Sequence, residues 1–136
     1  MIAVDTSVWI DFFRDTSTPQ VDMLICGIES NEITIPDLVV TEVLQGCDTD
    51  REFAALYQAL RPHRVLQTVD ETTALAAARH YRTLRTRGIT VRKTIDTLIA
   101  TRCITDDIPL LYSDRDFDPF VEHLGLRSAL DDLESF

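Results

Sequence analysis

Cysteine is scarce in this 136-residue sequence, and its distribution excludes several classes of protein. Cys26, Cys47 and Cys103 are odd in number and widely spaced, and no Cys-x-x-Cys pair occurs. This pattern gives no sign of a disulfide framework, a zinc site or a thiol redox site. Each cysteine has apolar neighbours, so we expect three buried thiols that pack as small hydrophobic side chains.

Long apolar runs are also missing. No stretch approaches the roughly 18 residues that a membrane-spanning helix needs, and the N-terminus lacks the basic, apolar and small-residue order of a secretory signal. The hydrophobic content of 45% is nevertheless enough to build a core. Without internal repeats or a linker, the sequence predicts a single domain over residues 1–136, and we expect it to be cytoplasmic, with no membrane partner.

Basic residues are also few: the sequence has 13 of them against 23 acidic residues, which gives a net charge of −10. Net charge therefore cannot attract a polyanion over long range. Six of the basic residues nevertheless fall within residues 79–93, a segment without acids, and these are Arg79, Arg82, Arg85, Arg87, Arg92 and Lys93. The segment fits either a solvated helix face or a contact surface for phosphate groups.

Hydrophobic periodicity predicts strands and helices in alternation. Strands are expected at residues 2–5, 33–36, 65–68 and 109–112, with a last edge strand at 124–127. Helices are expected at residues 8–13, 20–29, 53–60, 94–103 and 119–123, from a cap at Asp37 to Gly46, and from a cap at Asp70 to Gly88. Alternation of this kind predicts an α/β fold, with helices on both faces of a central, mostly parallel sheet of four or five strands.

Several carboxylates occur where such a sheet presents its ligand-binding edge. Asp5 ends the first expected strand, and Asp114 and Asp116 follow the strand at residues 109–112. Ligands of open parallel sheets bind beyond the carboxyl ends of the strands. Glu42 and Asp96 lie within helices and have apolar neighbours, where a carboxylate stays charged only if it faces water, a cation or a metal.

Each of these acids also has an ordinary explanation. Asp5 and one of the later pair could cap helices, and Glu42 and Asp96 could lie on the polar sides of amphipathic helices. If the acids converge, they raise one another's pKa unless a cation compensates them. Oxygen-only ligands favour Mg²⁺ or Mn²⁺ over zinc. Such an ion lowers the pKa of a bound water and stabilises the leaving oxygen of a phosphodiester.

Four segments together resemble the PIN-domain nucleases, and among them the VapC toxins of bacterial toxin–antitoxin pairs. The segments are Val-Asp-Thr-Ser-Val-Trp at 4–9, Pro-Asp-Leu-Val-Val-Thr-Glu-Val at 36–43, Ile-Asp-Thr-Leu-Ile-Ala at 95–100 and Leu-Leu-Tyr-Ser-Asp-Arg-Asp-Phe at 110–117. One segment alone would be a weak signal, whereas the four in this order span one whole domain. The resemblance implies a PIN-like three-layer α/β/α sandwich.

The resemblance also implies an activity and a set of site residues. It implies a Mg²⁺- or Mn²⁺-dependent endoribonuclease that cuts structured RNA such as transfer or ribosomal RNA and is silenced by a VapB-like antitoxin. It further implies a homodimer. The implied metal ligands are Asp5, Glu42, Asp96 and Asp114, with Asp116 binding metal directly or through water, and Ser7 orienting a carboxylate or water.

The basic segment precedes Asp96, which makes it the natural place for the RNA backbone to bind. Arg92 and Lys93 are the first candidates for phosphate contacts, followed by Arg85, Arg87 and Arg115. Trp9 and Phe13 could serve an interface with the antitoxin or with a second copy, but core packing is the simpler expectation.

Two rival enzyme classes fit poorly. A dehalogenase-type phosphatase needs a second Asp two residues after its nucleophile, where this chain has Ser7. A receiver domain needs a late lysine after a strand, whereas Lys93 is the sole lysine and precedes a helix. Two further alternatives stay open: a PIN-like module that binds RNA or protein without cutting, and a PIN nuclease that cuts DNA.

Overall fold

The fold is organised around a parallel sheet of four strands. The computed structural model describes residues 1–134. The strands are β1 (Ile2–Val4), β2 (Ile33–Pro36), β3 (Arg64–Leu66) and β4 (Leu110–Leu111), in the order β3-β2-β1-β4. Ala3 of β1 lies opposite Thr34 on one side and Leu110 on the other, and all three strand pairs are parallel. The α/β class and the parallel sheet are therefore confirmed.

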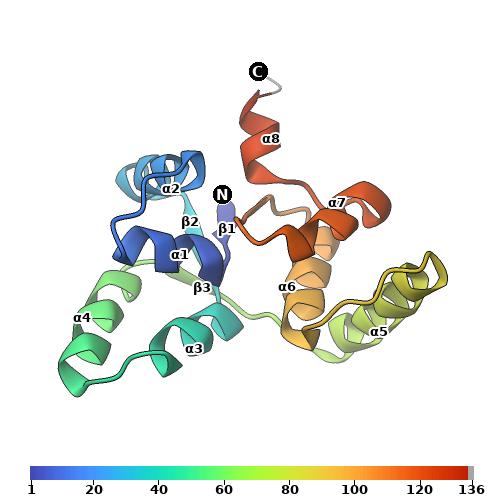
Figure 1. The fold of residues 1–136 in the computed structure, drawn as a ribbon, viewed down its shortest axis with the longest axis horizontal. Coiled ribbons are helices and arrows are strands. Elements are labelled where there is room, and N and C mark those ends of the chain that lie inside the picture. Colours follow the sequence, from blue (N-terminus) through green and yellow to red (C-terminus); the bar gives the residue numbers. More distant parts are fainter. Residues whose placement is uncertain (135–136) are drawn as a thin grey trace.

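Helices cover both faces of this sheet (Figure 1). They are α1 (Thr6–Phe13), α2 (Pro19–Glu29), α3 (Asp37–Gln45), α4 (Asp50–Leu60), α5 (Glu71–Thr86), α6 (Thr94–Thr105), α7 (Asp118–Leu124) and α8 (Ala129–Glu134), with a 3₁₀ helix η1 (Arg115–Phe117) before α7. In Figure 1, α1 to α4 lie on one side of the sheet, and α5 to α7 lie on the other. The predicted three-layer arrangement is confirmed.

The direction of the chain across the sheet changes at β1. From β1 the chain steps outward to β2 and β3, and the connection through α5 and α6 then returns it to β4 on the opposite side of β1. Right-handed crossovers put the outward and return connections on opposite faces. Such a reversal opens a crevice at the carboxyl ends of the two strands where it occurs, which here are β1 and β4.

Side-chain caps fix where several helices begin. Asp5, Thr18, Thr49 and Asp70 each accept a hydrogen bond from a backbone N–H in the first turn of the helix that follows. A cap of this kind stabilises a helix by about 1 kcal/mol. The predicted cap at Asp70 is confirmed. The prediction for Asp37 is wrong, because α3 begins at this residue, and its carboxylate accepts from the N–H groups of Leu38 and Thr68 instead.

The core lies between the sheet and both helical layers. Its largest fully buried side chains include Trp9, Phe117, Phe120, Ile35 and Ile99. Trp9 is thus a core residue, as expected. The ring of Phe13, which is half-buried, stacks on it at a centroid distance of 5.9 Å.

Three elements differ from the prediction, and two of them lie near the C-terminal end. Residues 124–127 do not form an edge strand, because Gly125, with φ 82°, ends α7 in the left-handed conformation. α8 begins at Ala129, so only an isolated bridge between Leu110 and Ser128 forms, beside the hydrogen bond from the Leu110 N–H to the Arg127 carbonyl. The short helix α8 itself was not predicted, and β3 lies one residue earlier than expected and ends two residues sooner.

The expectation of three buried thiols is also wrong. Cys103 is buried, Cys47 is half-buried and Cys26 is exposed. Cys26 occupies the outward face of α2, whose buried residues are Val21, Leu24 and Gly27.

Across residues 1–134, none of the helices combines the length and the apolar content that a membrane crossing requires.

Candidate functional site

Two neighbouring strands deliver acids to the same edge of the sheet. Val4 and Leu111 are paired at the carboxyl ends of β1 and β4, and Asp5 follows the first directly. The Asp5 carboxylate accepts hydrogen bonds from the Ser7 N–H at 3.1 Å and the Ser7 hydroxyl at 2.7 Å. Asp5 is therefore a helix cap and a member of the acidic edge at once, so the two interpretations of this residue do not exclude each other.

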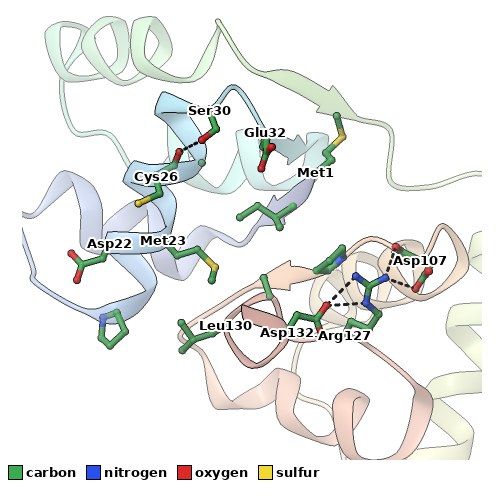
Figure 2. A pocket seen from close by; sticks show the side chains of 15 residues that line it. Met1, Asp22, Met23, Cys26, Ser30, Glu32, Asp107, Arg127, Leu130 and Asp132 are labelled. Atoms are coloured by element: carbon green, nitrogen blue, oxygen red, sulfur yellow. Dashed lines mark hydrogen bonds and ion pairs between the residues drawn. The ribbon is translucent and has the colours of Figure 1, made fainter. Parts of the chain in front are cut away.

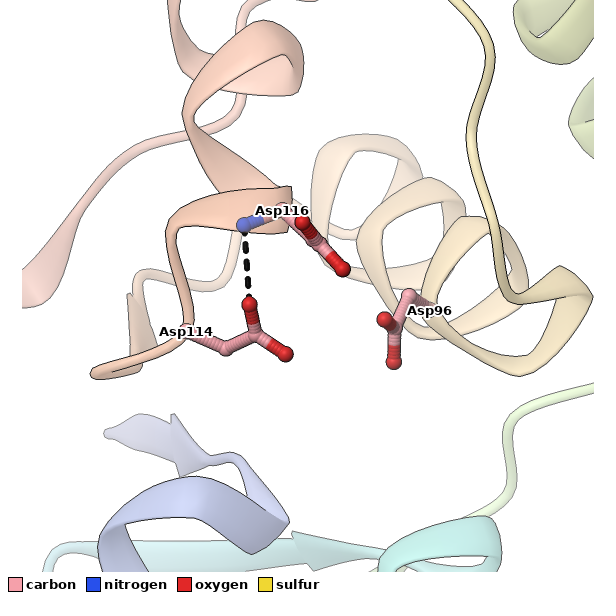
Figure 3. A group of neighbouring side chains, drawn as sticks. All are labelled: Asp96, Asp114 and Asp116. Atoms are coloured by element: carbon pink, nitrogen blue, oxygen red, sulfur yellow. Dashed lines mark hydrogen bonds between the residues drawn. The ribbon is translucent and has the colours of Figure 1, made fainter.

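Three further acids meet beside this strand end. Asp96, Asp114 and Asp116 each offer a carboxylate oxygen, and these oxygens lie within 4.8 Å of one another. Figure 3 shows the carboxylates turned toward a common space between α6 and η1. Asp114 caps η1 by accepting a hydrogen bond of 2.9 Å from the Asp116 N–H, which fixes the two acids relative to each other.

Asp96 is the most constrained of these acids. It lies in the first turn of α6 and is only 4% exposed, and its Oδ2 atom is buried without a hydrogen-bond partner. Burial raises the pKa of Asp96 to about 7, and the charges of Asp5, Asp114 and Glu42 add to this effect, while Lys93 opposes it. A buried carboxylate with an unpartnered oxygen among like charges needs a cation to be stable in its ionised form.

Asp5 and Glu42 flank the three acids and are coupled to them electrostatically. Burial raises the pKa of Asp5, the hydrogen bonds from Ser7 lower it, and the charge of Glu42 raises it. Glu42 lies on α3, the helix that follows β2. Its Oε1 accepts a hydrogen bond of 2.9 Å from the Thr6 hydroxyl. The acids expected from the sequence therefore lie together: the charges of Asp5, Glu42 and Asp114 all act on Asp96, and Asp116 lies within 4.8 Å of Asp96 and Asp114.

The donor set fits a hard divalent cation. Every candidate ligand is a carboxylate oxygen, which suits Mg²⁺ or Mn²⁺. Within residues 1–134, no lysine or arginine forms an ion pair with Asp5, Glu42, Asp96, Asp114 or Asp116. The unpartnered Oδ2 of Asp96 supplies a buried acceptor that a metal would satisfy.

The basic residues divide into two groups by position. Lys93 is the residue before α6, and its charge offsets part of the rise in the pKa of Asp96. Arg92 and Arg115 are exposed, the first shortly before Asp96 in the sequence and the second between Asp114 and Asp116. Arg85 and Arg87 lie instead at the end of α5, where the guanidinium of Arg85 sits 5.8 Å from the centre of the Tyr81 ring.

Comparison with known proteins places the chain in a family. The model of the PIN domain matches residues 2–121. The chain belongs to the PIN-domain family. It is 31% identical over 131 residues to the VapC ribonuclease Mb1587 of Mycobacterium bovis and, to the same extent, to the ribonuclease VapC11 of Mycobacterium tuberculosis, covering 95% of this chain and 98% of each relative. This identity over nearly full length places the PIN domain in the VapC group.

Solved structures of similar shape agree with the PIN fold. The VapBC2 crystal structure from Rickettsia felis, bound to a promoter DNA fragment, superimposes with a TM-score of 0.76 at 16% identity, over 94% of this chain and 97% of that one. FitAcB from Neisseria gonorrhoeae gives a TM-score of 0.72 at 18% identity, over 96% and 98%. At these identities the likeness supports the fold alone.

Two residues of the PIN-domain site were not predicted from the sequence. Thr6 binds Glu42 through its hydroxyl, and the Ser113 N–H donates to the Ser7 hydroxyl oxygen at 3.0 Å, joining residues that are 106 positions apart. Sequence patterns reveal neighbours along a helix or strand but do not reveal such distant partners. The one available signal was a run of two hydroxyl residues directly after Asp5.

The PIN domain also has a cavity at the amino ends of its strands. It has a volume of about 740 Å³ and lies between α2, α8 and the segments that precede β1, β2 and β4, with Met1, Glu32 and Pro109 on its wall. Figure 2 shows Arg127 there, paired with Asp107 at 2.9 Å and Asp132 at 3.0 Å. Asp107 and Asp132 at this edge thus have a protein cation as partner, unlike the acids at the carboxyl edge.

Proposed function

We propose that this PIN-domain protein is a Mg²⁺- or Mn²⁺-dependent endoribonuclease of the VapC type that hydrolyses phosphodiester bonds of structured RNA, such as transfer or ribosomal RNA. The observation that carries the proposal is the meeting of Asp96, Asp114 and Asp116 within 4.8 Å, with a buried, unpartnered oxygen on Asp96. The relatives named as ribonucleases support RNA as the substrate.

In this proposal Asp5, Glu42, Asp96 and Asp114 hold the metal, and Asp116 binds it directly or through water. A divalent cation held there would supply a hydrolytic nucleophile at neutral pH and neutralise the charge that develops on the phosphodiester. Ser7 orients the Asp5 carboxylate, because its hydroxyl donates to Asp5 at 2.7 Å and is itself held by the Ser113 N–H.

The RNA backbone would approach over the start of α6. Lys93 acts electrostatically on Asp96, and Arg92 is its exposed neighbour. Arg85, Arg87 and Arg115 are further candidates. Such contacts would give affinity and salt dependence without reading base sequence. They would be local, since the net charge of −10 repels RNA at long range.

We further propose that residues 1–136 form one PIN domain that acts in the cytoplasm, forms a homodimer and is inhibited by a VapB-like antitoxin. The antitoxin partner is supported by the structural neighbours, which include VapBC assemblies from Rickettsia felis and Salmonella typhimurium, both bound to DNA.

The test is cleavage of end-labelled RNA by the purified protein, freed of any antitoxin. Total transfer RNA is incubated with the protein in Mg²⁺ or Mn²⁺, and parallel reactions contain EDTA, the Asp96→Asn variant or the Asp107→Asn variant. Asp107 is an acid of the amino edge, in left-handed conformation, which asparagine tolerates well. We expect discrete fragments with the wild type and Asp107→Asn only.

The alternatives give different results in the same assay. Cleavage of DNA of equal structure, without cleavage of RNA, would identify a DNA-cutting PIN nuclease. If neither transfer nor ribosomal RNA is cut while the protein still binds RNA, the non-cutting module is correct. Fragments that persist in EDTA or with Asp96→Asn would contradict the proposed metal site.

A further inference from the structure

Two consecutive hydroxyl residues open α1, and each binds a different acid. The Ser7 hydroxyl donates to Asp5 Oδ2, its neighbour in sequence. The Thr6 hydroxyl donates instead to Glu42 Oε1 at 2.9 Å, across the contact between α1 and α3 and 36 residues along the chain. The first turn of α1 therefore joins the acid of β1 to the acid of α3.

Glu42 needs such a contact more than the other acids do. Its charge raises the pKa of both Asp5 and Asp96, so repulsion from these carboxylates favours rotamers that carry Glu42 away from the site. A glutamate also has more rotatable bonds than an aspartate, and the entropy of those rotamers acts in the same direction. Among residues 1–134, the Thr6 hydroxyl is the one side-chain donor to Glu42.

Threonine is well suited to this contact. Its branched Cβ restricts χ1, so the direction of the hydroxyl is set before a metal binds. The hydrogen bond uses Oε1 and leaves Oε2 available as a ligand. Hydrogen bonds that orient a ligating carboxylate strengthen metal binding, and their loss lowers metal affinity about 10- to 100-fold.

We infer that Thr6 is a positioning residue that holds Glu42 toward the acidic site and so raises the affinity of the site for its divalent metal. The inference rests on the proposed function, because it takes Glu42 as a metal ligand. It assigns Thr6 no contact with RNA or with the metal.

The experiment measures Mn²⁺ affinity by titration calorimetry, separately from cleavage. Four proteins are compared: the wild type, Thr6→Val, Thr6→Ser and Thr41→Val. Valine keeps the shape of threonine without its hydroxyl, and serine keeps the hydroxyl. Thr41 is a matched control, since it is exposed beside Glu42 and its hydroxyl contacts only the Asp37 carbonyl of its own helix.

We expect Thr6→Val to bind Mn²⁺ at least about tenfold more weakly, while Thr6→Ser and Thr41→Val stay close to the wild type. In the cleavage assay, Thr6→Val should need correspondingly more Mn²⁺ for half-maximal rate, and its KM for RNA at saturating metal should not change. A higher Mn²⁺ requirement with an unchanged KM for RNA distinguishes the positioning of a metal ligand from general damage to the fold.

Two results would overturn the inference while leaving the proposed function intact. Unchanged Mn²⁺ affinity in Thr6→Val would show that Glu42 needs no help from the hydroxyl. An equal loss of Mn²⁺ affinity in Thr6→Ser, which keeps the hydroxyl, would show that the hydroxyl alone does not hold Glu42. Failure of the wild type to bind Mn²⁺ would contradict the proposed function itself and this inference with it.

Discussion

The two edges of the sheet treat acidic residues in opposite ways. At the amino edge, Arg127 pairs with Asp107 and Asp132, so each of these acids has a cation within 3.0 Å. At the carboxyl edge, Asp96, Asp114 and Asp116 converge, and no lysine or arginine of residues 1–134 pairs with them. Two acids of the amino edge are thus neutralised by an arginine of the protein, whereas the three at the carboxyl edge have no such ion pair.

The contrast also exists within a single helix. Arg102, near the end of α6, pairs with Asp70 and Asp106, whereas Asp96 in its first turn has a buried oxygen without a partner. The chain therefore can neutralise acids with its own side chains and does not do so at the site. This difference points to an external cation at the carboxyl edge.

The largest expected effect is a difference in cleavage rate between two variants, each of which neutralises one acid at one edge of the sheet. Asp114→Asn should lower the rate of RNA cleavage about 10²- to 10³-fold, the usual loss on removing one group that stabilises a transition state electrostatically. Asparagine can still accept the hydrogen bond from the Asp116 N–H, so the turn should persist. Asp107→Asn should cleave at the wild-type rate. Similar rates for both variants would remove the distinction between the edges.

Metal should stabilise the fold through the carboxyl edge alone. At a Mn²⁺ concentration 100 times its Kd, binding should add about 2.7 kcal/mol to the free energy of unfolding. The rise in Tm is measured by calorimetry with and without EDTA. Asp96→Asn should lose the rise, and Arg127→Ala should keep it. A rise in Tm that persists in Asp96→Asn would place the metal outside the carboxyl edge.

Removing the basic residues next to the carboxyl edge should reduce RNA binding by a smaller factor. Replacing Arg92 and Lys93 together by alanine should weaken RNA binding by the uncleaving Asp96→Asn protein and reduce its salt slope by about 0.7 for each phosphate that is no longer neutralised. The matched control replaces Arg51 and Arg61, which are exposed at the two ends of α4. An unchanged slope in the first double variant would exclude both residues from the RNA path.

The smallest effect is expected at the amino edge. Arg127→Met removes two ion pairs, but its side chain is 43% exposed, so the free energy of unfolding should fall by only about 1 kcal/mol. Denaturation in urea at low and at high salt measures the loss, which should shrink as salt screens the pairs. Loss of cleavage in this variant would show that the two edges are not independent.

The acids of the site were predictable because they obey rules that act locally. Asp5 and Asp114 follow short apolar strands, and parallel strands bring such positions to one edge. Asp96 stood out because its helix is apolar on both sides of it. The contact between Thr6 and Glu42 was not predictable, since it depends on how α1 packs against α3.

Two of the wrong predictions, the strand at residues 124–127 and the burial of Cys26, have physical reasons. Residues 124–127 alternate in a way that is typical of a strand, yet Gly125 takes the left-handed conformation and α8 starts before a ladder can form. Cys26 has apolar neighbours in sequence, but the helical period turns it outward while Val21 and Leu24 face the core. Backbone conformation decided the first case and the helical period decided the second.

The reversal of the chain at β1 has a consequence for synthesis on the ribosome. Asp5 is made well before β4, but its strand needs β4 as a neighbour, and Ala3 pairs with Leu110. Asp114 and Asp116 emerge later still. A nascent chain that has not yet extended past residue 116 therefore carries some of the acids without the enclosure that brings them together. The site can form only after residue 116 has been added, so a shorter nascent chain lacks the assembled cluster of acids.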